Sequence, residues 1–94
     1  METRIVEATL RIEKMEALFD ELLEAFEKKG ADILFDEILK IHLSTLTEYY
    51  EGGEWMADFE LDELGVLPND LKRGILSEDR FYNFLFELDE SKND

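Results

Sequence analysis

Hydrophobic residues recur at alternating spacings of three and four along the first third of the chain. The positions are Ile5, Ala8, Ile12, Met15, Phe19, Leu22 and Phe26. This spacing is the a/d repeat of a heptad, and it predicts one long amphipathic helix over residues 3–29. Thr3 is the predicted N-cap. Lys28 and Lys29, followed by Gly30, are typical of a helix C-terminus, with cations in the last turn and a glycine after it.

A second apolar face begins after Asp32, a residue type that caps helix N-termini. Its members are Phe35, Ile38, Leu39, His42, Leu46 and Tyr49. The pattern predicts a helix over residues 33–50. Because the connection to the first helix is short, the two helices are expected to pack antiparallel as a hairpin.

Two glycines, Gly52 and Gly53, interrupt this pattern. Residues 54–64, with the sequence EWMADFELDEL, then predict a short third helix. Trp55 and Phe59 lie one turn apart in it and define an apolar face.

The stretch LPNDLKRGILSED joins the third helix to the last one. Pro68 prevents helix continuation, and Ser77 is a suitable N-cap for a helix over residues 78–88. Residues 89–94 are expected to fray. Apolar side chains surround nearly the whole circumference of this helix: Phe81, Tyr82, Phe84, Leu85, Phe86 and Leu88. Such a helix is either central in the bundle or meets a partner. A central position is favoured in so small a bundle, whereas exposure of Tyr82 or Phe86 would mark an interface.

These elements predict an all-α fold in which a long antiparallel helical hairpin packs with two shorter C-terminal helices. The result is a small helical bundle, and the length of 94 residues predicts one domain over residues 1–94. Hydrophobic residues make up 45% of the chain, which is enough for a packed core and excludes a disordered acidic tail.

Charge changes the picture of possible partners. The chain has 25 acidic and 10 basic residues, a net charge of −15, and residues 51–94 alone carry −9. Direct binding to a nucleic-acid backbone is not expected, because it requires basic residues to replace counterions. Cysteine is absent, and no run approaches the roughly 18 apolar residues of a membrane span. We therefore expect a cytoplasmic protein that does not bind membranes.

The sequence does not support catalysis. His42 is the only histidine and lies on an apolar face, where a half-buried structural histidine is the favoured interpretation. Ser44, Ser77 and Ser91 lie in no strand–turn–helix elbow, and no glycine-rich loop that holds phosphate is present. We expect no enzymatic activity and no cofactor.

Glu54, Asp58 and Asp62 recur every four residues on the third helix. Like charges at this spacing repel, which is compatible with a divalent cation or a basic partner. The calcium loop pattern is absent, and one straight helix rarely supplies the 6–8 oxygens that calcium requires. A solvated face is favoured, and these three residues remain weak metal candidates.

Lys72 and Arg73 form an adjacent basic pair within the acidic C-terminal half. They either bind an anion or pair internally with the acidic third helix. Internal pairing is favoured, because carboxylates are abundant nearby in the sequence.

The leading functional hypothesis is a non-enzymatic regulatory protein that binds a basic protein partner, with mimicry of nucleic acid as an extreme form. Aromatic residues beside acidic ones are typical of binding hot spots and fast association. The candidate partner-binding residues are Tyr49, Tyr50, Trp55, Asp58, Asp62, Lys72, Arg73 and Tyr82.

A structural homo-oligomer is the alternative from another class. In the heptad register of the first helix, Arg11 falls at g and Glu16 at the following e, a combination that suits a parallel pair. Apolar residues outside the a/d positions, such as Leu18 and Leu23, instead favour an ordinary bundle face. Monomer and homodimer both remain open.

Residues 49–85, YYEGGEWMADFELDELGVLPNDLKRGILSEDRFYNFL, resemble a small bacterial family, domain of unknown function 4298. The shared pattern is Tyr-Tyr, a glycine and Glu-Trp, then an acidic helix and Leu-Pro-x-Asp-Leu-Lys-Arg-Gly before Ser-Glu-Asp. The Gly-Gly at 52–53 and the phenylalanine-rich end depart from it. The resemblance implies a helical cytoplasmic protein and implies no activity, cofactor or site.

Overall fold

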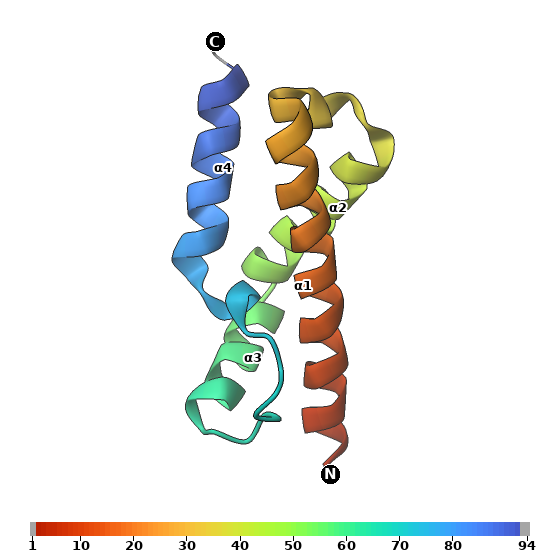
Figure 1. The fold of residues 1–94 in the computed structure, drawn as a ribbon. Coiled ribbons are helices and arrows are strands. Elements are labelled where there is room, and N and C mark those ends of the chain that lie inside the picture. The colour runs from red at the N-terminus through yellow and green to blue at the C-terminus, as the bar shows by residue number, and fades with distance from the viewer. Residues whose placement is uncertain (1, 93–94) are drawn as a thin grey trace.

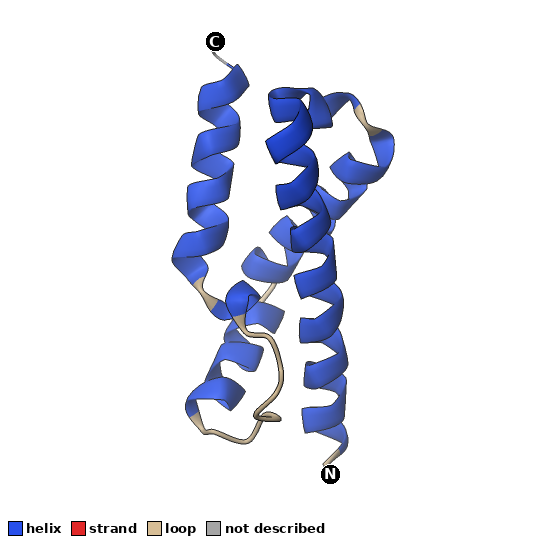
Figure 2. Ribbon diagram, viewed as in Figure 1, coloured by secondary structure: helices blue, strands red, loops and turns tan. Residues whose placement is uncertain are grey.

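The computed structural model describes residues 2–92, apart from the side chain of Glu78. Its elements are α1 (Thr3–Lys29), the 3-10 helix η1 (Gly30–Phe35), α2 (Glu37–Glu51), α3 (Glu54–Glu63), the 3-10 helix η2 (Gly74–Leu76) and α4 (Glu78–Lys92). No strand occurs within the described part of the chain, and Figure 2 shows helix almost throughout. The predicted all-α helical bundle is confirmed.

The elements run up and down along one long axis (Figure 1). α1 has 27 residues and so a length of about 40 Å, close to the longest dimension of the molecule, 47 Å. α2 and α3 run back along it. The segment 64–73, called the connector below, then returns the chain to η2, and α4 runs in the same direction as α1.

The core lies on the heptad face of α1. Ala8, Ile12, Met15, Phe19 and Leu22 are buried, and Ile5 and Phe26 pack at the two ends of this row. From α4, the Phe81 and Phe84 rings meet the Phe19 ring edge-on, with centroid distances of 5.9 and 5.6 Å. Aromatic rings therefore join α4 to α1.

The expectation of a central last helix is wrong. α4 lies at one side of the bundle in Figure 1 and buries Phe81, Phe84 and Leu88, while Tyr82 and Phe86 face solvent. The bundle supplies neighbours for only one side of this helix. The remaining apolar residues on it are left on the surface.

The second helix begins four residues later than Asp32 predicts. Residues 30–35 form η1, whose Ile33 is buried, and Asp36 is the residue that caps α2. The Asp36 Oδ1 accepts hydrogen bonds from the backbone N–H groups of Ile38 and Leu39, at 2.9 and 3.1 Å. Gly30, with φ of 60°, allows the turn out of α1.

Other helix ends differ slightly from the prediction. Glu2, not Thr3, occupies the N-cap position of α1, without a side-chain hydrogen bond. Residues 89–92 continue α4 to Lys92, so the expected fraying after residue 88 is wrong there, and residues 93–94 lie outside the described part. Ser77 has the extended backbone of a capping residue, with φ −89° and ψ 108°, directly before α4.

Candidate functional site

The backbone N–H and carbonyl of Ile75 in η2 form hydrogen bonds with side chains from three helices. The Ile75 N–H donates a hydrogen bond to the carboxylate of Glu16 on α1. The Ile75 carbonyl accepts from the Tyr50 hydroxyl on α2 and from the Trp55 indole N–H on α3, the latter at 3.0 Å. η2, which follows the connector, is therefore fixed by these hydrogen bonds as well as by the buried apolar Ile75 side chain.

Aromatic rings cover this bonded peptide. The Tyr50 ring is stacked on Phe81 of α4, with centroids 4.4 Å apart and an interplanar angle of 5°. Trp55 stacks against both Tyr50 and Phe59, at 5.6 and 5.1 Å. Tyr50 and Trp55, predicted as partner-binding residues, thus join α2, α3 and α4 to each other.

A side chain at Gly74 would require the neighbouring Arg80 side chain to move. A Cβ there would lie 2.0 Å from the Arg80 Nη1 atom and 3.0 Å from the Glu16 Oε1 atom. The Arg80 guanidinium also lies over the Phe19 ring, 5.3 Å from its centroid. Gly74, the first residue of η2, thus leaves space that the ends of the Arg80 and Glu16 side chains occupy.

Asp58 is fully buried, which corrects the interpretation of it as part of a solvated acidic face. The Arg11 guanidinium donates two hydrogen bonds to its carboxylate, one of them from Nε at 2.9 Å. The Tyr49 hydroxyl donates a third at 2.8 Å. These bonds satisfy the buried carboxylate, which would otherwise be costly to bury.

The same cluster shifts two pKa values. The hydrogen bond to Asp58 raises the pKa of Arg11, so that its guanidinium stays charged. Burial raises the pKa of Tyr49 well above its ordinary value, and the hydrogen bond to Asp58 adds to this shift. The cluster is therefore an ion pair with a neutral phenol. The raised pKa values keep the Arg11 guanidinium and the Tyr49 hydroxyl protonated near neutral pH.

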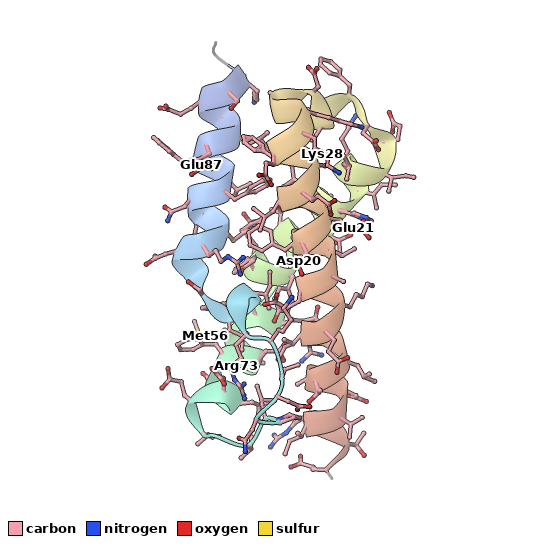
Figure 3. The ribbon with its side chains drawn as sticks, viewed as in Figure 1. Asp20, Glu21, Lys28, Met56, Arg73 and Glu87 are labelled. Atoms are coloured by element: carbon pink, nitrogen blue, oxygen red, sulfur yellow. The ribbon has the colours of Figure 1, made fainter. Side chains whose placement is uncertain are left out.

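Lys72 and Arg73 both pair internally. Arg73 lies beside α3 and the connector (Figure 3). Its Nε donates to Asp62 of α3 at 2.6 Å, and its other nitrogens donate to the carbonyls of Pro68 and Leu71 at 2.8 and 2.9 Å. The contact with the acidic third helix agrees with the predicted internal pairing. Lys72 instead reaches α1, where its Nζ lies 3.1 Å from Asp20.

Arg73→Ala should destabilise the fold by about 1–2 kcal/mol, because two connector carbonyls and Asp62 lose their donor. Lys72→Ala should cost less than about 0.5 kcal/mol, since its ion pair is exposed and screened by solvent. Urea unfolding followed by circular dichroism measures both values. Equal effects of the two substitutions would show that Arg73 does not hold the connector.

The weak metal candidates on α3 have basic neighbours instead. Glu54 lies 3.6 Å from Arg11, while Asp58 and Asp62 bond Arg11 and Arg73. No group of three or more potential metal-ligating side chains comes together among the residues the structure describes. The lone His42 is half-buried, and its Nε2 lies 2.7 Å from Glu21 Oε2 on α1.

The heptad face of α1 is covered within the chain. Arg11 at g bonds Asp58, and Glu16 at e bonds Ile75, so neither side chain is available for a parallel pair. The a and d residues form the core described above. A homodimer through this heptad would require the bundle to open. The oligomeric state, monomer or homodimer, stays a prediction.

Comparison with known proteins gives one result. The model of the family described as Domain of unknown function (DUF4298) matches residues 12–94, most of the chain. The chain belongs to DUF4298. No curated protein and no solved structure matches it.

This DUF4298 chain leaves few of the predicted partner-binding residues on its surface. Tyr49, Trp55 and Asp58 are buried, whereas Lys72 and Tyr82 are exposed. The exposed large apolar side chains include Tyr82 and Phe86 on α4 and a group at the η1–α2 end that consists of Phe35, Ile38 and Ile41. Val6, Leu10, Met56, Leu64 and Val66 are exposed elsewhere. The sequence signal for Tyr82 and Phe86 was the all-round apolar pattern of α4.

A groove of about 440 Å³ runs between α1 and the connector of the DUF4298 fold. It is lined by Thr9, Glu13, Glu16, Ala17, Asp20, Pro68, Asp70, Leu71 and Lys72. Four of the lining residues are acidic, and the one base, Lys72, pairs with Asp20 across the groove.

Over the described residues, no helix combines the length and the apolar character needed to traverse a bilayer.

Proposed function

We propose that this DUF4298 protein is a non-enzymatic, acidic interaction protein that binds a basic protein partner. The observation that carries the proposal is the distribution of charge. Arg11, Lys72 and Arg73 each form an intramolecular ion pair with a carboxylate. Exposed carboxylates without a basic group within 4 Å, among the residues described, include Glu60, Glu63, Asp70, Glu87 and Glu90.

This arrangement favours a basic protein over other ligands. Uncompensated carboxylates on α3, the connector and α4 produce a negative field that attracts positively charged surfaces and speeds association. Exposed apolar side chains nearby supply the surface that gives affinity once the partner is close. Nucleic acid is not proposed as a direct ligand, because the same field repels phosphate. The chain lacks cysteine, which suits a reducing compartment, and the cytoplasm is the proposed setting.

A salt-dependent pull-down tests this function. The purified protein is immobilised and exposed to lysate of its source cells at about 50 mM salt, then washed at about 500 mM, where exposed charge pairs are screened. An unrelated acidic helical protein of equal net charge is the control bait. We expect a basic protein that is retained at low salt, released at high salt and absent from the control. Recovery of the same proteins on both baits would contradict the proposal.

A further inference from the structure

The outward side of α4 carries a second helical stripe opposite the buried one. Asp79, Tyr82, Phe86 and Asp89 follow each other at spacings of three, four and three, and Glu90 lies beside Asp89. All five are exposed, whereas Phe81, Phe84 and Leu88 face the core. We call these five exposed residues the outer stripe.

The outer stripe places aromatic rings between acids. Phe86 is 65% exposed and Tyr82, one turn earlier, is 46% exposed. Asp79 precedes them by one turn, and Asp89 and Glu90 follow Phe86 by one turn. Asp89 pairs with Lys92 at 3.6 Å, and the structure describes no such base beside Glu90. The stripe therefore offers an apolar centre with negative ends.

We propose that the outer stripe of α4 binds a basic amphipathic helix of the partner protein, with Phe86 as the main anchor. The inference rests on the proposed function and adds to it the surface and the form of the partner. The spacing of three and four is the repeat that a second helix matches when it packs lengthwise. The 15 residues of α4 provide about four turns for this contact.

Lysine and arginine fit this surface better than other side chains do. Their aliphatic stems cover aromatic rings, and their cations reach carboxylates beyond the ring edge. A cation above the face of Phe86 or Tyr82 gains further attraction from the ring. Apolar residues of the same partner helix would cover the remaining ring surface. Charge and apolar contact thus act along the same stripe.

A second copy of this chain does not fit the stripe. In an antiparallel pair that brings Tyr82 opposite Phe86, Asp79 of one copy faces Asp89 of the other. In a parallel pair, each acid faces its own equivalent. Both orientations bring like charges together, which opposes association.

The test uses a fluorescein-labelled peptide of about 18 residues, with leucine at a and d and lysine elsewhere, read out by fluorescence anisotropy at about 50 mM salt. Phe86→Ser is compared with Ile41→Ser, which removes an equally exposed apolar residue on α2. Asp89→Lys/Glu90→Lys is compared with Glu60→Lys/Glu63→Lys on α3. Both of these double charge reversals change the net charge by the same amount. Both also place lysines in the last turn of a helix, where the helix dipole favours positive charge.

We expect Phe86→Ser and Asp89→Lys/Glu90→Lys each to weaken binding about tenfold, with Ile41→Ser unchanged and Glu60→Lys/Glu63→Lys weakened less than about threefold. Circular dichroism of each variant should match that of the parent. Equal losses for the two double reversals, or equal effects of the two serine variants, would overturn the stripe as the site. Salt-sensitive peptide binding would in that case still support the proposed function.

Three further outcomes distinguish the inference from its alternatives. If the peptide with the same composition in scrambled order binds equally well, the partner is not recognised as an amphipathic helix, and the inference fails. Sedimentation that shows a dimer converted to monomer by Phe86→Ser would assign the stripe to a second copy instead. A pull-down without any salt-sensitive partner would remove the proposed function itself.

Discussion

Asp58→Ala is expected to lower the free energy of unfolding by about 3 kcal/mol, because it leaves a buried ion pair without its acid. Asp58 is fully buried and accepts bonds from Arg11 and Tyr49. The Arg11 side chain keeps 25% of its surface exposed and has Glu54 at 3.6 Å. Water and Glu54 therefore compensate the guanidinium in part, and the expected cost lies at the low end for broken buried pairs.

Three comparisons separate charge from shape at this position. Asp58→Asn keeps the volume and an acceptor for the Tyr49 hydroxyl, so it should cost less than alanine does. Asp62→Ala removes the same side chain from the same helix, but its partner Arg73 is only partly buried, and about 1 kcal/mol is expected. In Arg11→Ala/Asp58→Ala the loss should be smaller than the sum of the single losses, because neither charge is left without a partner.

Urea unfolding monitored by circular dichroism gives these values, with Arg11→Ala measured as the fifth variant. A domain of this length typically has about 5–14 kcal/mol of stability, so a loss of about 3 kcal/mol lowers the midpoint clearly. An effect of Asp58→Ala no greater than that of Asp62→Ala would mean that the cluster adds nothing beyond a surface pair. Additivity of the Arg11 and Asp58 losses would argue against their direct coupling.

The helices that the sequence predicts well are those with a clear hydrophobic period and glycine at the end. α1 shows this most clearly: Gly30 ends it, and its a/d residues form the core. Local pattern and tertiary packing agree there, so the spacing alone was sufficient. The start of α2 was harder, because Asp32 and Asp36 are both possible caps. The choice depends on Ile33, whose burial in η1 a local pattern does not reveal.

The Asp58 cluster was missed because like charges every four residues resemble a solvated stripe. Asp58 also lies one turn after Trp55 and one turn before Leu61, on the apolar side of α3. That position was a signal for burial. Its partners Arg11 and Tyr49 come from other helices, 47 and 9 residues away, so no local pattern connects them. Long-range polar pairs of this kind require the fold.

The internal pairing of Arg73 could be anticipated from charge, but its bonds to the Pro68 and Leu71 carbonyls could not. The bent connector turns these carbonyls toward the guanidinium. Because the connector is not helical, its carbonyls lack the regular N–H partners of a helix, and the arginine donates to these two. Proline and glycine predicted the bend itself. The stretch LPNDLKRGILSED thus has a largely structural role. The outer stripe of α4, in contrast, exposes its aromatic and acidic side chains to solvent.

Glu16→Ala is the second substitution with a large expected effect. Glu16 is buried against η2, and its carboxylate accepts the Ile75 N–H. Alanine leaves this donor without a partner inside the protein, at a cost of about 2 kcal/mol. Glu16→Gln keeps an oxygen acceptor at the same place and should cost less than about 1 kcal/mol. Glu13→Ala, an exposed position one turn earlier, should change stability by less than about 0.5 kcal/mol.

Hydrogen exchange of the Ile75 amide distinguishes this bond from a general loss of packing. In Glu16→Ala this amide should exchange faster than the global loss of stability accounts for, because η2 opens locally. In Glu16→Gln its protection should remain close to that of the parent. If glutamine destabilises as much as alanine does, the negative charge beside Arg80 matters more than the acceptor. In that case the charge of Glu16 near Arg80, rather than its hydrogen bond to Ile75, would stabilise η2, and Arg80→Ala should reproduce the loss.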